Sequence, residues 1–358
     1  MKIAYYLVHD LTRNDGVVKK IKSQISEWEN LGVEVKVFAI SGFCENSIID
    51  ANIYGFSGFI SSRVRPNKNL LNDIDEFNPD LVYLRYDTVT ANILFLAKKY
   101  KLICELNTID RDEAKLFFKS NVNLKSTFRL LAFYLLRNRF FHQMSGLVSV
   151  THEILNHNSI RKYQIPQVCV PNSIQTSQYP TLKSPDPSQS RIGLFFMGTP
   201  DQPWQGFDIL EQLAQDLPEF DFHVVGLLKP SYSNVYYHGF LSAEKYLPIM
   251  MKCHVCIGTL ALFRKNMEEA CPLKIREYIA NGFPIIIGYK EAMFEDHSHL
   301  PEWALEIDPR NPNLVSIREF CVRVKDRIVS NAEAFPLVDS SILEKRRVDF
   351  FDSILSQE

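Results

Sequence analysis

Residues 269–288 read Glu269-Ala-Cys-Pro-Leu-Lys-Ile-Arg-Glu277-Tyr-Ile-Ala-Asn-Gly-Phe-Pro-Ile-Ile-Ile-Gly288. This pattern predicts a loop, then a helix, then a strand. Pro272 suits the first helical position, because its missing N–H would have no partner there. Asn281-Gly282 is typical of a helix C-terminus, and Pro284 prevents the helix from continuing. The β-branched run at 285–287 predicts a buried parallel strand.

The start of this helix is a candidate anion-binding site, because free N–H groups and the helix dipole favour negative charge. Lys274 lies in the first turn, Glu269 precedes the helix, and Glu277 lies within it. A phosphate held at Leu273 and Lys274 would leave one carboxylate on each side. We expect these carboxylates to accept hydroxyl groups from two sugars joined by a diphosphate, which is the shape of a nucleotide-sugar.

The same residues carry a family resemblance. Two glutamates separated by seven residues, with Pro-Leu-Lys between them and Tyr278-Ile-Ala-Asn-Gly-Phe-Pro284 after them, resemble the Glu-x7-Glu signature of retaining, family 4 type GT-B glycosyltransferases. A bare Glu-x7-Glu occurs by chance in most proteins, whereas the extended string is much more specific. The alternative interpretation is an ordinary amphipathic helix with solvated glutamates.

Strand-like and helix-like segments alternate along the chain, which predicts parallel sheets with right-handed crossovers. In the first half the predicted strands are 3–8, 33–40, 81–86, 102–106, 146–150 and 167–170, with a helix at 17–31. In the second half they are 191–198, 221–226, 236–240, 253–259 and 285–287, and a helix is expected to open at Trp204. The fold class is therefore α/β, with the GT-B architecture of two Rossmann-like domains facing across a cleft.

The domain boundaries follow from composition and from the resemblance. Residues 1–172 are expected to form the N-terminal acceptor domain, and the tail at 342–358 to pack back on it. Residues 173–190 have the Ser, Pro, Thr and Gln content of an exposed linker. Residues 191–341 are expected to form the donor domain.

Composition excludes several classes of protein. The chain has 358 residues and a formal net charge of -2, so it does not have the charge of a general nucleic-acid binder. No apolar run is long enough to cross a bilayer, and the N-terminal segment becomes polar too quickly for a signal peptide. Seven scattered cysteines are typical of a cytoplasmic protein with reduced thiols. Cys253-His-Val-Cys256 is expected to be core, since no second pair completes a zinc site.

The resemblance implies a role for each residue around the Glu-x7-Glu string. Glu277 is expected to accept hydrogen bonds from the ribose, and Glu269 from hydroxyls of the transferred sugar. Backbone N–H groups of Leu273 and Lys274, just after Pro272, are expected to hold the diphosphate. The donor is a nucleoside diphosphate sugar, and no other cofactor and no metal is expected, because no Asp-x-Asp motif lies in a suitable loop.

Four further residues are implied to lie near the donor or the acceptor. His238 and Gly239 fall where the family passes the base, so backbone contact is expected there. Gly16 falls where the family places a turn close to the phosphate, although a glycine after aspartate also simply starts a helix. Where many members carry a histidine near the acceptor, this chain has Asn107, with Glu105 and Glu113 as alternative acidic groups.

The chain departs from the family pattern after the first strand of its second half. Members usually carry an arginine after the glycine equivalent to Gly198 and a lysine before the next glycine, but this chain has Thr199 and Gln205. Two missing cations would weaken stabilisation of the leaving diphosphate by roughly several kcal/mol. The candidate replacements are Arg264, Lys265, Lys274 and Lys229.

The stretch at 123–141 is predicted to be a long helix with aliphatic, aromatic and basic residues and no acidic ones. A basic amphipathic helix can lie on an anionic membrane surface, as suits an enzyme with a lipid-linked acceptor. The alternative is a core-packed helix with arginines at the surface.

The expected function is a hexosyltransferase reaction with retention and without metal, onto a glycan or lipid-linked acceptor, in bacterial surface polysaccharide or lipopolysaccharide synthesis. The alternatives are an inactive subunit that binds nucleotide-sugars and a GT-B sugar-nucleotide epimerase. A dinucleotide oxidoreductase is not supported, because neither first-strand turn carries Gly-x-Gly-x-x-Gly.

Overall fold

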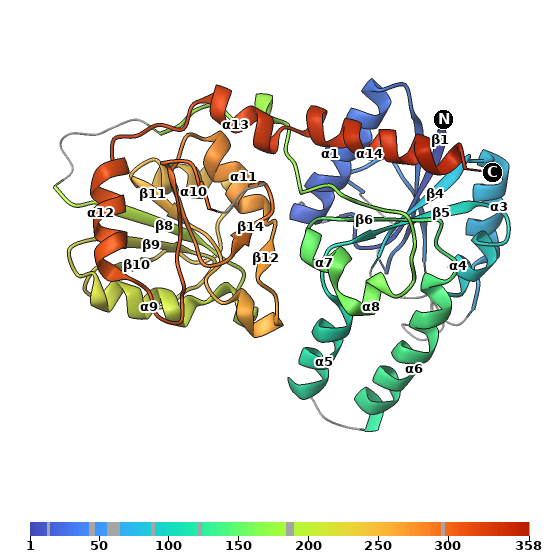
Figure 1. Cartoon of the computed structure of the whole chain (residues 1–358), viewed down its shortest axis with the longest axis horizontal. Coiled ribbons are helices and arrows are strands. Elements are labelled where there is room, and N and C mark those ends of the chain that lie inside the picture. The colour runs from blue at the N-terminus through green and yellow to red at the C-terminus, as the bar shows by residue number, and fades with distance from the viewer. Residues whose placement is uncertain are drawn as a thin grey trace. The chain divides into compact units, whose positions relative to one another are not determined.

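The computed structural model of the chain describes residues 1–12, 15–42, 47–55, 65–86, 90–120, 124–183, 190–294 and 298–357, without the side chains of 116, 117, 119, 120, 124, 125, 128, 129 and 132. Two compact units contain these residues (Figure 1). The N-terminal unit comprises Met1–Asn172 and Ser340–Glu358, and the C-terminal unit comprises Ser173–Asp339.

The N-terminal unit is built on a seven-stranded sheet in the order β3-β2-β1-β4-β5-β6-β7, and every neighbouring pair is parallel. The strand order reverses between β1 and β4, as in doubly wound folds. The strands are β1 (Lys2–Val8), β2 (Glu34–Ile40), β3 (Asn52–Tyr54), β4 (Leu81–Arg85), β5 (Lys101–Leu106), β6 (Gly146–Ser149) and β7 (Gln167–Cys169). The helices are α1 (Gly16–Asn30), α3 (Lys68–Phe77), α4 (Ala91–Leu96), α5 (Asp110–Ser120), α6 (Leu124–Phe141), α7 (His152–Asn156), α8 (Asn158–Arg161) and α14 (Ser340–Leu355).

The C-terminal unit repeats this design with a six-stranded parallel sheet in the order β10-β9-β8-β11-β13-β15. Its strands are β8 (Gly193–Met197), β9 (Asp221–Val225), β10 (Val235–Tyr237), β11 (Val255–Ile257), β13 (Ile285–Ile287) and β15 (Ala304–Glu306), and β12 (Glu269–Ala270) and β14 (Lys290–Glu291) form a separate pair. Its helices are α9 (Phe207–Asp216), α10 (Ala243–Met250), α11 (Leu273–Ala280), α12 (Leu314–Val324) and α13 (Asn331–Val338), with short 3-10 turns η1 (Thr176–Gln178), η2 (Pro203–Gln205) and η3 (Leu262–Lys265). The sheets confirm the predicted α/β class with two Rossmann-like halves.

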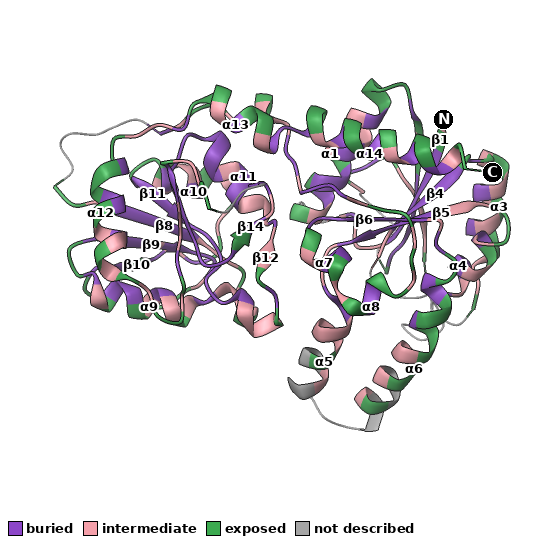
Figure 2. Cartoon of the chain, viewed as in Figure 1, coloured by how far each residue is buried: buried purple, intermediate pink, exposed green. Residues whose placement is uncertain are grey.

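Most of the strand residues are buried on both faces, which explains the apolar runs in the sequence (Figure 2). The helix expected to open at Trp204 begins instead at Phe207. Residues 203–205 form η2, and Gly206 has a left-handed φ of 80° before α9 starts. The helix therefore begins three residues later than predicted. Gly206 suits this turn, because glycine adopts a positive φ without strain.

The last helix, α14, lies along α1 and completes the core of the N-terminal unit (Figure 1). The indole of Trp28 stacks on Tyr5 with ring centroids 5.6 Å apart and meets Phe351 of α14 edge-on at 5.3 Å. Its Nε1 donates to the carboxylate of Glu344 at 2.8 Å. Residues more than three hundred positions apart thus share one buried cluster.

A buried network of charges centres on Glu105 in β5. One carboxylate oxygen accepts from Lys20 and, at 3.1 Å, from Arg85. The other accepts from the hydroxyl of Tyr83 at 2.6 Å and lies 3.4 Å from Arg347 of α14. Burial alone would raise the pKa of Glu105, but the three cations hold it well below its usual range. Glu105 is therefore a structural anion, so the acidic role considered for it is not supported.

The helix α6 projects with α5 from the N-terminal unit (Figure 1). Arg137 is not at its surface: the guanidinium is 2% exposed and makes a bidentate pair with Asp110 at 2.6 and 2.8 Å. The sequence analysis did not predict this pair, because Asp110 lies in α5 and Arg137 in α6. Leu131, Leu135 and Leu136 are exposed instead. Asn123 and the side chains of Lys125 and Arg129 lie outside the described residues.

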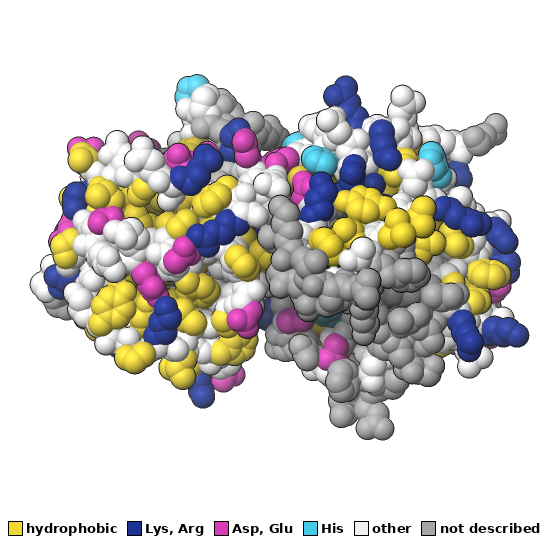
Figure 3. Space-filling view, turned by 90° about the horizontal axis from the view of Figure 1, so that it is seen from below, with side chains coloured by type: hydrophobic (Ala, Val, Ile, Leu, Met, Phe, Trp, Pro, Cys, Tyr) yellow, Lys and Arg dark blue, Asp and Glu magenta, His cyan; other side chains and the backbone are white. Residues whose placement is uncertain are grey.

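Among the described residues, no helix combines the length and the apolar character that crossing a bilayer requires. On the face of the C-terminal unit visible in Figure 3, acidic and basic side chains are intermixed. That face has no extended patch of one sign, in agreement with the small net charge.

The Glu105 network predicts that substitutions of two neighbouring cations of α14, Arg347 and Lys345, lower the free energy of unfolding by very different amounts. Replacing Arg347, which is fully buried, with methionine leaves Glu344 and Glu105 short of a counter-charge and should lower the free energy of unfolding by about 3–5 kcal/mol. Lys345→Ala removes only an exposed pair with Asp349 and should cost less than about 1 kcal/mol. Urea denaturation of both variants measures the difference, and equal costs would contradict this account of the network.

Candidate functional site

Glycines line the carboxyl edge of the C-terminal sheet. Glycines follow five of its strands within two residues: Gly198, Gly226, Gly239, Gly258 and Gly288. The closest approach is at Gly226, where φ is 102° and an added Cβ would lie 1.7 Å from the carbonyl oxygen of Gly198. Ligands of such sheets bind outside the carboxyl ends, where the strand order reverses. Here that point lies between β8 and β11.

The N-terminus of α11 opens close to this point. The helix begins at Leu273, and Pro272 is its N-cap with φ −75° and ψ 137°, so the expected placement of Pro272 at the first helical position is wrong by one residue. The chain is still extended there because it has just left β12. Pro272 itself makes no side-chain capping hydrogen bond, and its carbonyl accepts from the N–H of Ile275 at 3.1 Å. The N–H groups of Leu273 and Lys274 therefore precede the first bonded turn.

The ammonium of Lys274 reaches from α11 to the end of β8. Its Nζ donates to the carbonyl of Met197 at 2.9 Å and to the side-chain oxygen of Gln205 at 3.0 Å, and it lies 4.6 Å from the ring centroid of Phe196. No carboxylate in the described part of the chain forms an ion pair with it. Burial lowers the pKa of Lys274 to about 7. The resemblance implies a cation at position 205. In this chain Gln205 is instead a hydrogen-bond acceptor for the cation Lys274 of α11.

Glu277 lies on α11 beyond this ammonium and is held by a tyrosine. The hydroxyl of Tyr246, from α10, donates to its Oε1. Burial and the charge of Glu277 together raise the pKa of Tyr246 and bring that of Tyr179 to about 12. Both tyrosines are therefore neutral donors at physiological pH. The sequence analysis missed them, because neither is near Glu277 in sequence.

Glu269 lies in β12, half-buried, before the turn into α11. It pairs in register with Lys290 of β14. Two carboxylates of the string therefore flank the helix N-terminus, one in a strand and one within the helix, as the spacing predicts.

The expected base-binding residues have their main-chain donors occupied. The N–H of His238 bonds to the carbonyl of Val224 at 2.9 Å, and that of Gly239 to Leu227 at 3.1 Å. The imidazole of His238 stacks on His223, with their nitrogens 3.1 Å apart. A main-chain contact with a base at these residues must therefore use an acceptor rather than their N–H groups.

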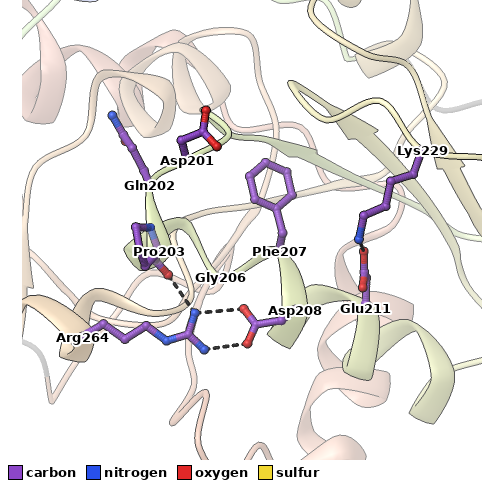
Figure 4. A pocket seen from close by; sticks show the side chains of 9 residues that line it. All are labelled: Asp201, Gln202, Pro203, Gly206, Phe207, Asp208, Glu211, Lys229 and Arg264. Atoms are coloured by element: carbon purple, nitrogen blue, oxygen red, sulfur yellow. Dashed lines mark hydrogen bonds and ion pairs between the residues drawn. The ribbon is translucent and has the colours of Figure 1, made fainter. Parts of the chain in front are cut away.

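Two of the four candidate replacement cations are already neutralised. Figure 4 shows a pocket at the start of α9 in which Arg264 faces Asp208, at 2.9 and 2.6 Å, and Lys229 faces Glu211, at 2.6 Å. Lys265 lies over the ring of Trp204 at 4.5 Å. Thr199 is exposed in the loop after β8 and supplies no charge. Of the four, Lys274 is the cation with neutral partners at the strand-order reversal.

The candidate residues of the N-terminal unit sit at two strand-to-helix connections. Asn107 follows β5, and its side-chain oxygen accepts from Lys20 at 3.2 Å. Gly16 is the first residue of α1, and the carboxylate of Asp15 caps that helix through the N–H groups of Val17 and Val18. This helix start therefore already holds an anion, and a phosphate role for Gly16 stays a prediction. Glu113 is half-buried in the first turn of α5.

No group of three or more His, Cys, Asp or Glu residues able to hold a metal ion occurs in the described ranges. Cys253 and Cys256 are both buried, and burial raises the pKa of both thiols. These side chains pack as core.

The lowered pKa of Lys274 predicts a pH-dependent stability difference. Lysine normally titrates at 10.5, so the unfolded chain binds a proton between about pH 7 and 10.5 that the folded protein does not. Stability therefore rises with pH across this window. Lys274→Met should be more stable than wild type below pH 7, by a margin that shrinks toward pH 10.5. Thermal melts across this range measure it, with the exposed Lys245→Met as control; a constant margin would contradict the assignment.

The sequence and the structure were compared with those of known proteins. No protein-family model matches the chain, and no curated protein has a matching sequence. Solved structures match along the whole length. They include sucrose-phosphate synthase from Thermosynechococcus elongatus, at 12% identity, 100% of both chains and a TM-score of 0.68. The lipopolysaccharide outer core galactosyltransferase WaaB matches at 12% identity, 99% of both chains and a TM-score of 0.62.

A third match is HepE from Anabaena, solved in complex with UDP and glucose, at 14% identity, 98% of this chain, 99% of that chain and a TM-score of 0.63. At such identities the likeness concerns the fold. The two parallel sheets, with their strand orders and their full-length match to glycosyltransferase structures, show that the chain has the GT-B fold, as the Glu-x7-Glu string predicts.

Proposed function

We propose that the protein is a glycosyltransferase that moves a hexose from a UDP-sugar to a glycan or lipid-linked acceptor. One observation carries the proposal: the ammonium of Lys274, whose partners are a carbonyl and an amide oxygen, belongs to the first turn of α11, and Glu269 and Glu277 flank that turn in the sequence. A diphosphate would supply the missing negative charge. The match to HepE in complex with UDP and glucose supports uracil as the base.

Each group has a chemical task in this reaction. The N–H groups of Leu273 and Lys274 bind the diphosphate, whose charge keeps the Lys274 ammonium protonated and so stabilises the leaving group. Glu277, oriented by Tyr246, accepts from the ribose hydroxyls. Glu269 accepts from hydroxyls of the sugar. The departing phosphate oxygen takes the acceptor proton on the same face, which retains the anomeric configuration without a metal.

The N-terminal unit would bind the acceptor, with Asn107 near the reacting hydroxyl. The exposed leucines 131, 135 and 136 of α6 and the exposed Arg139 after them support contact with the cytoplasmic face of the inner membrane. WaaB, a lipopolysaccharide galactosyltransferase of similar fold, supports a place in bacterial surface polysaccharide assembly.

One observation favours a second candidate, a subunit that binds nucleotide-sugars without turnover. Thr199 and Gln205 are uncharged, and Arg264 and Lys229 are committed to carboxylates. Lys274 then supplies most of the positive charge for the leaving group, which favours binding over rapid chemistry.

A screen of nucleotide-sugars tests the proposal. The purified protein is heated with UDP-, GDP-, ADP- and CMP-sugars, without metal and then with Mg²⁺, and release of sugar is followed. Stabilisation by the UDP class with slow hydrolysis is the expected result. Stabilisation without hydrolysis, even when acceptors are added, supports the second candidate. No stabilisation by any nucleotide would contradict the site at α11.

The two glutamates should fail in different ways. Glu269→Ala should abolish turnover while UDP still binds, because this residue is assigned to the sugar. Glu277→Ala should weaken UDP binding by about 10–100-fold, the loss of one or two charge-assisted hydrogen bonds. Calorimetric titration with UDP and a hydrolysis assay separate the effects. The opposite pattern would exchange the two assignments, and full activity of Glu269→Ala would overturn the site.

A further inference from the structure

Arg276 of the Glu-x7-Glu string belongs to a buried group of three side chains that has no role in the reaction described above. Arg276 of α11 and Glu291 of β14 are both 0% exposed, and their Nη1 and Oε1 atoms are 2.6 Å apart. The hydroxyl of Tyr289 donates to the other carboxylate oxygen at 2.9 Å. Taking two charges out of water is expensive, and apolar residues of the same volume often stabilise a core as well or better.

These residues close a ring of contacts around Glu269. The chain runs from β12 through Cys271 and Pro272 into α11, where Arg276 reaches back to Glu291 of β14. Strand β14 in turn pairs with β12, with Glu291 in register with Ala270. The ring thus links the strand that carries Glu269 to the helix that carries Lys274 and Glu277.

The peptide groups on both sides of Glu269 are held from β14. The carbonyl of Glu268 accepts from Lys290 at 2.8 Å, and the carbonyl of Ala270 accepts from Ala292 at 3.0 Å. A pair of two-residue strands has little stability of its own. The Arg276–Glu291 ion pair fastens strand β14 to the helix.

We propose that Arg276, Glu291 and Tyr289 are positioning residues that hold Glu269 at the sugar end of the donor site, an inference that rests on the proposed function. Because these side chains are buried, we assign them no contact with the donor or the acceptor. Their loss is expected to affect binding of the sugar only, because the residues assigned to the diphosphate and the ribose lie on α11 itself.

The test replaces the group without leaving a charge or hydroxyl unpaired. The triple variant Arg276→Met, Tyr289→Phe, Glu291→Leu keeps the volume and removes the polar links. Lys183→Met is the matched control. It removes another buried cation of the same unit, whose Nζ donates to the carbonyls of His254 and Val324, away from β12. Hydrogen exchange of the amides, which needs no ligand, and UDP and UDP-glucose binding and hydrolysis are measured on all three proteins.

In the triple variant, exchange at Lys290 and Ala292 is expected to rise roughly tenfold or more. Its turnover of UDP-glucose is expected to fall roughly 10–100-fold while its affinity for UDP stays within about twofold of wild type. Lys183→Met should leave both the exchange at Lys290 and Ala292 and the turnover of UDP-glucose as in the wild type.

Two outcomes overturn the inference. If exchange at Lys290 and Ala292 is unchanged in the triple variant, the three side chains do not hold β12. If exchange rises but turnover does not fall, their role is structural only. Failure of the wild type to bind UDP would instead overturn the proposed function, while the exchange result would still decide whether the ring holds the strand.

Discussion

The C-terminal unit depends on a cation that its own chain leaves uncompensated. Lys274 is bound by one carbonyl and one amide oxygen, and burial brings its pKa to about 7. A protein tolerates such a group where something else benefits, since desolvating a charge without a counter-charge destabilises the fold. Gln205, the N–H groups at the start of α11 and the reversal of strand order lie together at that place. In the proposed function, a diphosphate supplies the counter-charge there.

The N-terminal unit shows the opposite arrangement. Glu105 is surrounded by three cations from three different elements, and each of its oxygens is satisfied within the fold. Its ionisation is locked, and its task is to join α1, β4, β5 and α14. The two buried charges thus differ in their partners: Glu105 is surrounded by cations, whereas Lys274 has neutral ones.

Local patterns in the sequence were sufficient for most of the fold. The strand at 285–287 has the predicted bounds, and the other predicted strands differ by one or two residues at their ends, except 236–240, which runs three residues past the end of β10. The short strands β3, β12, β14 and β15 were not predicted. The errors lie in backbone detail and in long-range pairs. Pro272 is extended rather than helical, and α9 begins only after Gly206.

The site was predictable only where it is local. The Glu-x7-Glu spacing brings Glu269, Lys274 and Glu277 to one helix start, but it gives no sign of Tyr246 or of the Arg276–Glu291 pair. A signal did exist: Arg276 falls among buried positions of α11, and Glu105 falls inside an apolar strand. A charged residue among apolar ones predicts a buried partner of opposite charge, but only the structure shows which residue that partner is.

The place of α14 in the chain has a consequence for biosynthesis. The ribosome makes residues 1–172 first, yet the N-terminal unit is finished only when residues 340–357 arrive, after the whole C-terminal unit. At ordinary elongation rates that interval lasts on the order of ten seconds. Throughout it, Trp28 and Tyr83 lack their Phe351 neighbour, and Glu105 lacks Arg347. The nascent N-terminal half therefore lacks one helix beside α1, and α14 completes its core only after the C-terminal unit has been synthesised.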